Sequence, residues 1–249
     1  MGVVLVVTGC ADDAAPPADP GAAEEPEVFR YAMSGAYQPF SYFDENDNLV
    51  GFDVEIGAAL AEAMGMEAEP VPTPWQALPM GLGTRYEAII GSMTITEERL
   101  QKFDFSDPYY RSGPKVFVQA DSGITSVEDL TADSTIAVLM ESVYEDLAAE
   151  ITDNLKFYES DMLALRELGS GRADAVITDQ IVGLTNAREL DLDIIAVGDI
   201  LIVEEIGIAI PKGNPELLAR INRALADIKA DGTYLAICGK YVGGDISGD

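Results

Sequence analysis

From Val28 onward, short apolar runs alternate with stretches of helical periodicity, and this alternation restricts the fold more than any other feature of the chain. Runs such as 29–33 and 175–178 have the length and composition of buried strands. The two clearest helical patterns start at Asp53 and Asn214, and each of these residues is expected to cap its helix. Strand–helix alternation produces largely parallel sheets covered by helices, so the chain is expected to be an α/β protein.

The same alternation continues through the middle of the chain. Strands are expected at 116–119 and 135–139, and helices are expected to start near Ser126, near Ser142 and at Met162. Neither of the two clear helical stripes is a binding surface by default, since periodic apolar faces of this kind normally pack on a core.

The balance of charged residues restricts the partners of the protein. The chain has 44 acidic and 15 basic side chains, for a formal net charge of −29. Such a surface repels phosphate backbones, so a nucleic-acid partner is not expected. The excess of acid, with only six lysines, is typical of a protein that works at high salt, where ions screen the repulsion. An ordinary acidic secreted protein is the alternative interpretation.

Histidine is absent from the sequence. This removes the commonest general base, the Ser-His and Cys-His nucleophile pairs, and the usual zinc ligand sets. We therefore expect no catalytic residue, no metal site and no cofactor, although acid–base chemistry by carboxylates stays possible.

The N-terminal segment has the features of an export signal and a spacer. Residues 1–10 end in Val-Thr-Gly-Cys and resemble a residual signal with a lipobox, in which Cys10 is lipidated. A working signal needs a basic start and a longer apolar core, so the natural start is expected upstream. The alternative is an apolar stub with a free thiol. Residues 11–27, rich in Ala, Asp, Pro and Glu, are expected to be a disordered acidic tether. Cys238 is expected to be buried and unpaired.

The segment 88–99 carries the clearest indication of a binding site. An apolar run, 88–90, leads into Ser92 and Thr94, and a helix start containing Arg99 follows. Ligands of open α/β sheets bind where strands end and helices begin, because backbone N–H groups converge there. An arginine adds a planar, two-pronged donor that fits a carboxylate. The segment therefore predicts a site for a small carboxylate. A solvated arginine on the first helical turn is the alternative.

Several motifs, in order along the chain, carry a resemblance to a known family. They are YQPF at 37–40 with GFDVEI at 51–56, IIGSMTITEER at 89–99, FSDPYY at 105–110, GRADA at 171–175 with Asp179, and KADGT at 229–233. This set resembles the family 3 extracytoplasmic solute-binding proteins, the amino-acid receptors of ABC importers. The resemblance covers roughly residues 28–243.

The resemblance implies a two-lobed periplasmic binding protein of type II. Each lobe is expected to be a mainly parallel sheet flanked by helices. Lobe 1 is expected at 28–111 and 206–249, and lobe 2 at 115–203, with two hinge strands between them. Hinge closure would trap a ligand between the lobes.

The resemblance also implies roles for individual residues. Arg99, assisted by Thr94, would hold the α-carboxylate of the ligand, and Asp179 in lobe 2 would hold its ammonium group. Gly91 would add a backbone carbonyl, and Ser92 a hydroxyl or N–H group. Opposite charges on the two lobes would then bind the two poles of a zwitterion only when the lobes close. For Asp179 the alternative is a helix N-cap.

The remaining candidate residues concern the ligand side chain and the lobe 2 loop. Tyr37 and Trp75 resemble the aromatic walls of the family, with core packing as the alternative for Trp75. Ser142 and Val143 stand in the loop that contacts the carboxylate, where Val143 offers only its N–H. Ser34 stands where the family often has an aspartate that serves basic ligands. These departures favour a neutral or weakly polar amino acid, or a zwitterionic compatible solute.

The resulting expectation is a monomeric, lipid-anchored receptor that delivers such a zwitterion to ABC permease subunits. It would lie outside the cytoplasm, on the outer face of the cytoplasmic membrane or in the periplasm, and would contact the membrane only through its lipid anchor. Two alternatives share the fold. One is a cyclohexadienyl dehydratase-like enzyme, for which Glu141 is the candidate acid, and the other is an extracellular sensor domain.

Overall fold

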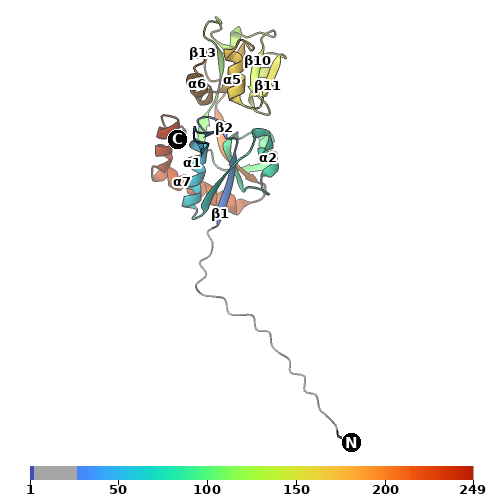
Figure 1. The fold of residues 1–249 in the computed structure, drawn as a ribbon, viewed down its shortest axis with the longest axis vertical. Helices are drawn as coiled ribbons and strands as arrows, with labels where there is room; N and C mark the ends of the chain where they lie inside the picture. The colour runs from blue at the N-terminus through green and yellow to red at the C-terminus, as the bar shows by residue number, and fades with distance from the viewer. Residues whose placement is uncertain (3–26, 249) are drawn as a thin grey trace.

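A computed structural model describes residues 1–2 and 27–248 of the chain. Cys10, the rest of the lipobox, and the expected tether up to residue 26 lie outside the described residues. The described chain forms two lobes stacked end to end, with the C-terminus beside the lower lobe in Figure 1. We call the lower part lobe 1 and the upper part lobe 2.

Each lobe is organised around one sheet. In lobe 1 the strand order is β5 (Glu67–Pro72), β1 (Val28–Met33), β6 (Ala88–Thr94), β14 (Glu204–Pro211) and β7 (Phe103–Phe105), with β8 (Tyr110–Ser112) also paired to β14. In lobe 2 the order is β11 (Leu155–Tyr158), β10 (Ile136–Leu139), β12 (Ala175–Asp179), β9 (Pro114–Gln119) and β13 (Ile194–Val197). A small sheet contains β2 (Ala36–Tyr37), β3 (Ser41–Phe43) and β4 (Leu49–Val50).

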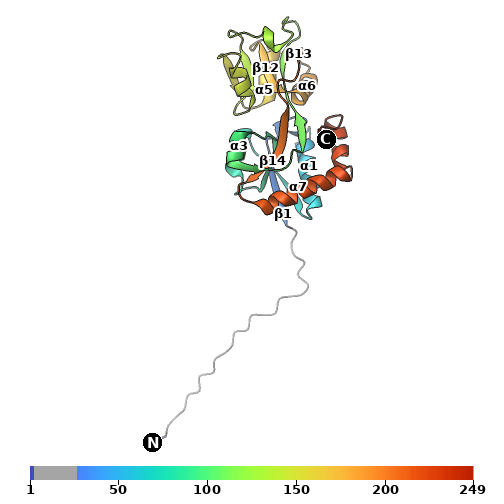
Figure 2. The same cartoon turned by 180° about the vertical axis from the view of Figure 1, so that it is seen from behind.

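Both large sheets are mixed, and the connections explain why. β1 pairs in parallel with β5 and β6, and β10 pairs in parallel with β11 and β12, because a helix lies in each connection. β14 and β9, which enter their sheets directly from the other lobe, pair antiparallel with their neighbours. Figure 2 shows β14 running down from the junction of the lobes into the first sheet.

The helices flank these sheets. In lobe 1 they are α1 (Phe52–Ala63), the 3-10 turn η1 (Trp75–Ala77), α2 (Leu78–Gly81), α3 (Glu97–Lys102), α7 (Pro215–Ala230) and α8 (Thr233–Tyr241). In lobe 2 they are the 3-10 turn η2 (Val127–Asp129), α4 (Tyr144–Ala149), α5 (Asp161–Gly169) and α6 (Gln180–Glu189). The helix expected near Ser126 is thus a single 3-10 turn, closed by reciprocal bonds between Ser126 and Asp129.

Helix α7 forms as its sequence predicts. The Asn214 side chain caps it by accepting a hydrogen bond from the backbone N–H of Leu217 at 3.2 Å, and Pro215 is its first residue. Ile221, Leu225 and Ile228 are buried in the lobe 1 core. Cys238, on α8, lies in the same core as a free thiol, as expected.

The predicted cap of α1 was wrong. Asp53 is the second residue of the helix, and Gly51 is its N-cap, with φ of 134°. The N–H groups of Phe52 and Asp53 donate to the carbonyl oxygens of Pro39 and Phe40. Backbone carbonyls of the preceding loop therefore satisfy the first turn, and the Asp53 side chain, which is 0% exposed, is available for another role.

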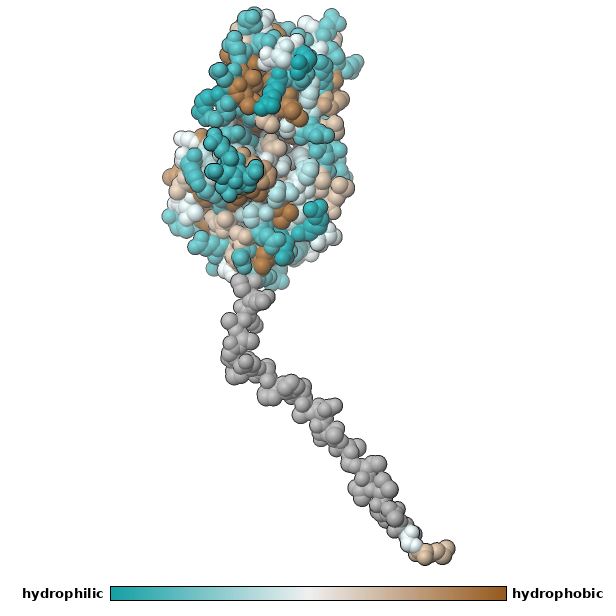
Figure 3. Space-filling model, viewed as in Figure 1, coloured by the Kyte–Doolittle hydropathy of each residue, from teal (hydrophilic) through white to brown (hydrophobic). Residues whose placement is uncertain are grey.

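The surface of both lobes carries hydrophilic and apolar residues side by side. Figure 3 shows hydrophilic residues over most of the visible face of both lobes, with apolar residues in small groups. Within the described ranges, no helix combines the length and the apolar character that crossing a bilayer requires.

Candidate functional site

A cavity of about 450 Å³ lies between the two lobes. This volume is within the range of about 300–1,000 Å³ that small-molecule sites occupy. Nine of the ten predicted binding residues line it: Ser34, Tyr37, Trp75, Gly91, Ser92, Thr94, Arg99, Ser142 and Val143. The structure thus brings together residues from strand ends, loops and helix starts of both lobes, and Asp179 is the predicted residue that is outside this lining.

Arg99 is held on the lobe 1 side of the cavity. It lies in the first turn of α3, whose N-cap Thr96 accepts a hydrogen bond from the Arg99 backbone N–H at 3.1 Å. Its Nη1 donates to the backbone oxygen of Thr94 at 3.0 Å, and its guanidinium carbon is 5.5 Å from the centre of the Trp75 ring. Burial lowers the pKa of Arg99, and nearby Glu204 opposes this shift. The guanidinium is therefore held by the wall of the cavity and differs from a freely solvated surface arginine.

Glu204 is a functional candidate that the sequence analysis missed. It opens β14 and is 2% exposed. Its two carboxylate oxygens accept hydrogen bonds from the hydroxyl of Thr94 at 2.7 Å and from the hydroxyl of Tyr144, in lobe 2, at 3.2 Å. Burial raises its pKa to about 6. The hydroxyl of Thr94 therefore already donates to a protein carboxylate. In the sequence, an acid within the apolar run at 201–210 was the signal that could have identified Glu204.

Asp179 adopts the arrangement that was its alternative interpretation. It is the N-cap of α6, and its Oδ1 accepts hydrogen bonds from the N–H groups of Ile181 and Val182 at 2.7 and 3.2 Å. The side chain is 2% exposed, and burial raises its pKa to about 6. Its predicted contact with a ligand ammonium group stays a prediction.

Asp161 is a second residue that the sequence analysis missed, and it does line the cavity. It is the first residue of α5, after the N-cap Ser160, and is 1% exposed. Its Oδ1 accepts a hydrogen bond from the Thr178 hydroxyl at 2.6 Å. Burial raises its pKa to about 6. Acidic residues are common in the first turn of a helix because they interact favourably with the helix dipole. The sequence around Asp161 therefore gave no sign that this residue belongs to a binding site.

The two donors of Ser92 have partners within lobe 1, and the predicted contact of Ser92 with a ligand stays a prediction. Its hydroxyl donates to Asp53 Oδ2 at 2.9 Å, and its backbone N–H donates to the Tyr109 hydroxyl at 3.1 Å. The Tyr109 hydroxyl in turn donates to Asp53 Oδ1 at 2.7 Å. Ser92 has φ of 57°, and burial raises the pKa of Asp53 to about 7. Both donors of Ser92 are thus turned toward the interior of lobe 1, and they hold the backbone of the cavity wall in place.

Two hydrogen bonds connect the lobes beside the cavity, in addition to that from Tyr144 to Glu204. Trp75 Nε1, in lobe 1, donates to the backbone oxygen of Glu141, in lobe 2, at 3.3 Å. Asn186 Nδ2, on α6, donates to the backbone oxygen of Gln38 at 3.4 Å. Glu141 is not part of the cavity lining, and its side chain is exposed. Its predicted place as a catalytic acid in the cleft is therefore not supported by its position.

The loops around the cavity are held by short-range bonds. The Ser142 hydroxyl donates to the backbone oxygen of Leu139 at 2.7 Å, and Val143 is the N-cap of α4. Ser34 Oγ accepts a hydrogen bond from the N–H of Ala36 at 3.2 Å. Tyr37 stacks on Phe40 with ring centres 5.6 Å apart.

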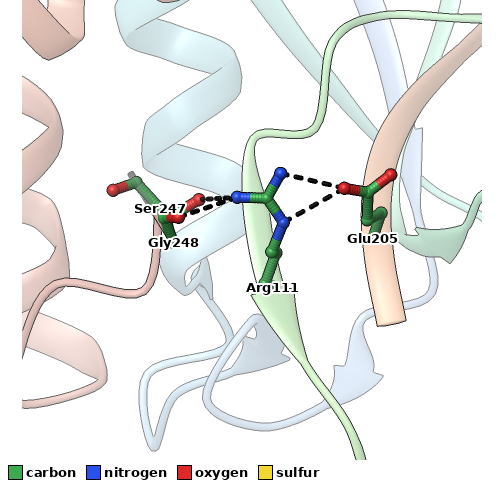
Figure 4. A network of polar contacts seen from close by, with 4 residues as sticks. All are labelled: Arg111, Glu205, Ser247 and Gly248. Carbon is green, nitrogen blue, oxygen red and sulfur yellow. Dashed lines mark hydrogen bonds and ion pairs between the residues drawn. The ribbon is translucent and has the colours of Figure 1, made fainter. Parts of the chain in front are cut away.

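The strands that connect the lobes are joined by a polar contact on their outer side (Figure 4). Arg111, on β8, donates through Nε and Nη2 to Oε1 of Glu205, on β14, at 3.1 and 2.8 Å. Its Nη1 donates to the backbone oxygens of Ser247 and Gly248 at 3.3 and 2.9 Å. The C-terminal segment is thereby attached to both connecting strands.

Comparison with known proteins agrees with this geometry. The family model for bacterial extracellular solute-binding proteins, family 3, matches residues 29–244. The chain is 31% identical to the L-cystine-binding protein TcyJ of Escherichia coli (strain K12) in an alignment of 219 positions that covers 86% of this chain and 82% of TcyJ. It is 34% identical to the L-arginine-binding protein of Pseudomonas aeruginosa in an alignment of 254 positions that covers 91% of this chain and 92% of that protein.

Solved structures show the same architecture. One similar structure is the ancestral amino acid-binding protein AncCDT-1, a precursor of cyclohexadienyl dehydratase, with a TM-score of 0.79 and 37% identity, covering 86% of this chain and 95% of that one. Another is the arginine-, lysine-, histidine-binding protein ArtJ of Geobacillus stearothermophilus, with a TM-score of 0.82 and 29% identity, covering 88% of this chain and 96% of that one. The predicted two-lobed α/β fold class and the family resemblance are confirmed.

Proposed function

The chain belongs to the bacterial extracellular solute-binding proteins of family 3, and from this premise we propose that it is the extracytoplasmic receptor of an ABC importer for an amino acid. The observation that supports this proposal most strongly is the cavity between the lobes, with the guanidinium of Arg99 on the lobe 1 side and the buried carboxylate of Asp161 on the lobe 2 side.

The charges in this cavity suit the two poles of an amino acid. We infer that Arg99 binds the α-carboxylate and that a carboxylate of lobe 2 binds the ammonium group. Hydrogen bonds to charged groups contribute about 1.5–3 kcal/mol each. A micromolar ligand has about 8 kcal/mol of binding free energy in total. Because each pole is bound by a different lobe, full affinity requires closure, which couples occupancy to the shape that a permease recognises.

A calorimetric screen of the standard L-amino acids tests the proposal. At least one is expected to bind in the micromolar range or more tightly. The α-carboxamide of the same amino acid is expected to bind at least about tenfold more weakly, because it cannot pair with a guanidinium as an anion. If none of the amino acids bound, the proposed function would be wrong.

The attachment and partners of the receptor belong to the same proposal. We propose that Cys10 is lipidated, that residues 11–27 connect the anchor to lobe 1, and that a monomer docks on the permease subunits. Several acyl chains would be needed for firm anchoring, since one chain binds membranes only marginally. Mass spectrometry of Cys10 in protein recovered from its native membrane tests the anchor, and an unmodified thiol would contradict it.

A dehydratase is the second candidate, because one structural neighbour is described as a precursor of cyclohexadienyl dehydratase. The curated relatives reported above are binding proteins. Incubation with prephenate or arogenate separates the two functions. The receptor proposal predicts no aromatic product, and turnover of either compound would support the enzyme.

A further inference from the structure

The cavity contains more negative than positive groups. Among the described residues that line it, Arg99 is the cationic side chain, while Glu159 and Asp161 are acidic. Two further buried acids lie near its walls: burial raises the pKa values of Tyr37 and Tyr144, to which the charge of Asp179 adds in both and that of Glu204 in Tyr144, and Glu204 opposes the lowering of the Arg99 pKa by burial. A neutral zwitterion brings one positive and one negative pole, so it leaves this excess of negative charge unchanged.

Asp161 is the acid with an unused acceptor. Its Oδ1 is bonded to the Thr178 hydroxyl, but its Oδ2 is buried and has no hydrogen-bond partner among the described residues. The residue is 1% exposed and lies in the cavity wall. Within the described part of the chain, no lysine or arginine forms an ion pair with it. Buried polar atoms are nearly always bonded, so an orphaned carboxylate oxygen at a cavity points to a donor that the ligand brings.

We infer that Asp161 determines specificity, because it accepts a cationic side-chain group of the ligand and so selects a basic amino acid. This inference rests on the proposed function and names the ligand class of the same cavity. The α-carboxylate pairs with Arg99 on lobe 1, and one lobe 2 carboxylate takes the α-ammonium group. The additional positive charge of a basic side chain then offsets the remaining negative charge and gives Asp161 Oδ2 its donor.

The inference revises the expectation drawn from Ser34. The absence of an acid at that position favoured a neutral ligand, on the assumption that lobe 1 supplies the anchor for a basic side chain. In the structure a buried acid is available on the opposite wall, at the start of α5. Lobe 2 can therefore perform the task that Ser34 cannot.

Arginine and citrulline make the matched pair of ligands for the test, because they have nearly the same shape and differ in the charge of the terminal group. Calorimetry at pH 7.5 is expected to show that the unmodified protein binds L-arginine at least about tenfold more tightly than L-citrulline. A discrimination of this size is expected because a hydrogen bond between two charged groups is stronger than one between a charged and a neutral group. If citrulline or glutamine bound as tightly as arginine, the inference would be overturned while the proposed function would stand.

The variant Asp161→Asn tests the residue itself. Asn keeps an oxygen that can accept from Thr178 and removes the charge, so the fold is expected to persist. The arginine-to-citrulline ratio should fall to within about threefold, mainly through weaker arginine binding. Asp153→Asn, the same chemical change at an exposed site of lobe 2, should leave the ratio unchanged.

Two results would contradict the role of Asp161. An unchanged ratio in Asp161→Asn would place the basic side chain elsewhere. An equal loss for arginine and citrulline would assign Asp161 to the α-ammonium group and remove its role in specificity. Should the variant fail to fold, the ratio measured for the unmodified protein still decides whether the cavity selects a basic ligand.

Discussion

The two walls of the cavity are built differently. On the lobe 1 wall Arg99 is bonded to Thr94, Thr94 to Glu204, and Ser92 to Asp53, while Nε2 of Gln76 is a buried donor without a partner among the described residues. On the lobe 2 wall Asp161 retains a buried oxygen without a partner among the described residues. Groups that are already oriented, such as the Arg99 guanidinium, position a ligand with little reorganisation, whereas an unmet carboxylate acceptor such as Asp161 Oδ2 gains most when a cationic group of the ligand arrives. The comparison indicates that lobe 1 orients the ligand and that lobe 2 discriminates among ligands.

The largest expected effect concerns the lobe 1 wall. Arg99→Ala should reduce the affinity for the amino acid by about 3–5 kcal/mol, because the ligand carboxylate would be left buried without its partner. Titration calorimetry measures this loss. Arg85→Ala, which removes an exposed arginine of the same lobe, should have no effect on binding. Equal affinities for the protein with and without the Arg99 side chain would contradict the orienting role of lobe 1.

The next effect concerns how firmly each wall is held. Ser92→Ala removes the donor to Asp53 Oδ2 and should lower the free energy of unfolding by about 1–3 kcal/mol, since a buried acceptor loses its partner. Thr178→Val is the matched change in lobe 2, because it removes the donor to Asp161 Oδ1. Urea denaturation measures both. Ser122→Ala, at an exposed serine, is the control, with a change below about 0.5 kcal/mol.

If Ser92→Ala were as stable as the unmodified protein, the Asp53 network would not hold the lobe 1 wall. A loss confined to Thr178→Val would reverse the comparison, because lobe 2 would then contain the more firmly held wall.

The pH dependence of folding depends on the buried carboxyl groups around the cavity, which come from both lobes. In the folded protein the pKa values of Asp161, Asp179 and Glu204 are raised by burial to about 6. Protons therefore bind the folded state more tightly than the unfolded state. As the pH falls through about 6, protonation of these groups increases the free energy of unfolding, and this contribution is lost as the pH rises through that value.

The affinity for a cationic ligand changes with pH in the opposite direction to the folding stability. Acidification weakens binding, because a cationic ligand requires ionised carboxylates. Arginine affinity should decrease by up to about tenfold, or about 1.4 kcal/mol, for each proton that must be released, between pH 7 and pH 5. Calorimetry at several pH values measures this decrease, and Asp161→Asn should flatten it. An affinity that rose on acidification would contradict ionised carboxylates as the acceptors in lobe 2.

The smallest effect concerns the contact between β8 and β14, the two strands that lead from lobe 1 to the junction of the lobes. Arg111→Lys keeps the charge but loses the two-pronged bond to Glu205, an ion pair whose side chains are 34% and 51% exposed. Partly exposed pairs contribute about 0–1 kcal/mol, so the free energy of unfolding should change by no more than that. A loss well above 1 kcal/mol in urea denaturation would show that this contact, together with the C-terminal segment, is a main support of the junction.

The sequence predicted the lobe 1 wall better than the lobe 2 wall, and the reason is physical. Gly91, Ser92, Thr94 and Arg99 belong to one continuous strand–helix segment, so local patterns place them together. Asp161 enters the cavity from the start of a helix that is distant in sequence from this segment, and only tertiary packing makes it buried and partnerless.

Two further differences have the same origin. Asp53 had the local features of a helix cap, but the carbonyl oxygens of Pro39 and Phe40 take that role, and Asp53 bonds Ser92 and Tyr109 instead. Asp179 could be a cap or a ligand contact by sequence; the structure shows the cap, and the ligand contact stays a prediction. Side chains that suit two local roles are assigned only by the contacts that the fold creates.

A crystal structure of the protein with bound L-arginine tests the central claim most directly. The account predicts that the ligand lies in the cavity between the lobes, with its α-carboxylate on the guanidinium of Arg99 and its side-chain guanidinium on Oδ2 of Asp161. A ligand bound elsewhere, or bound here with its carboxylate away from Arg99 and its side chain away from Asp161, would contradict the division of tasks between the two walls.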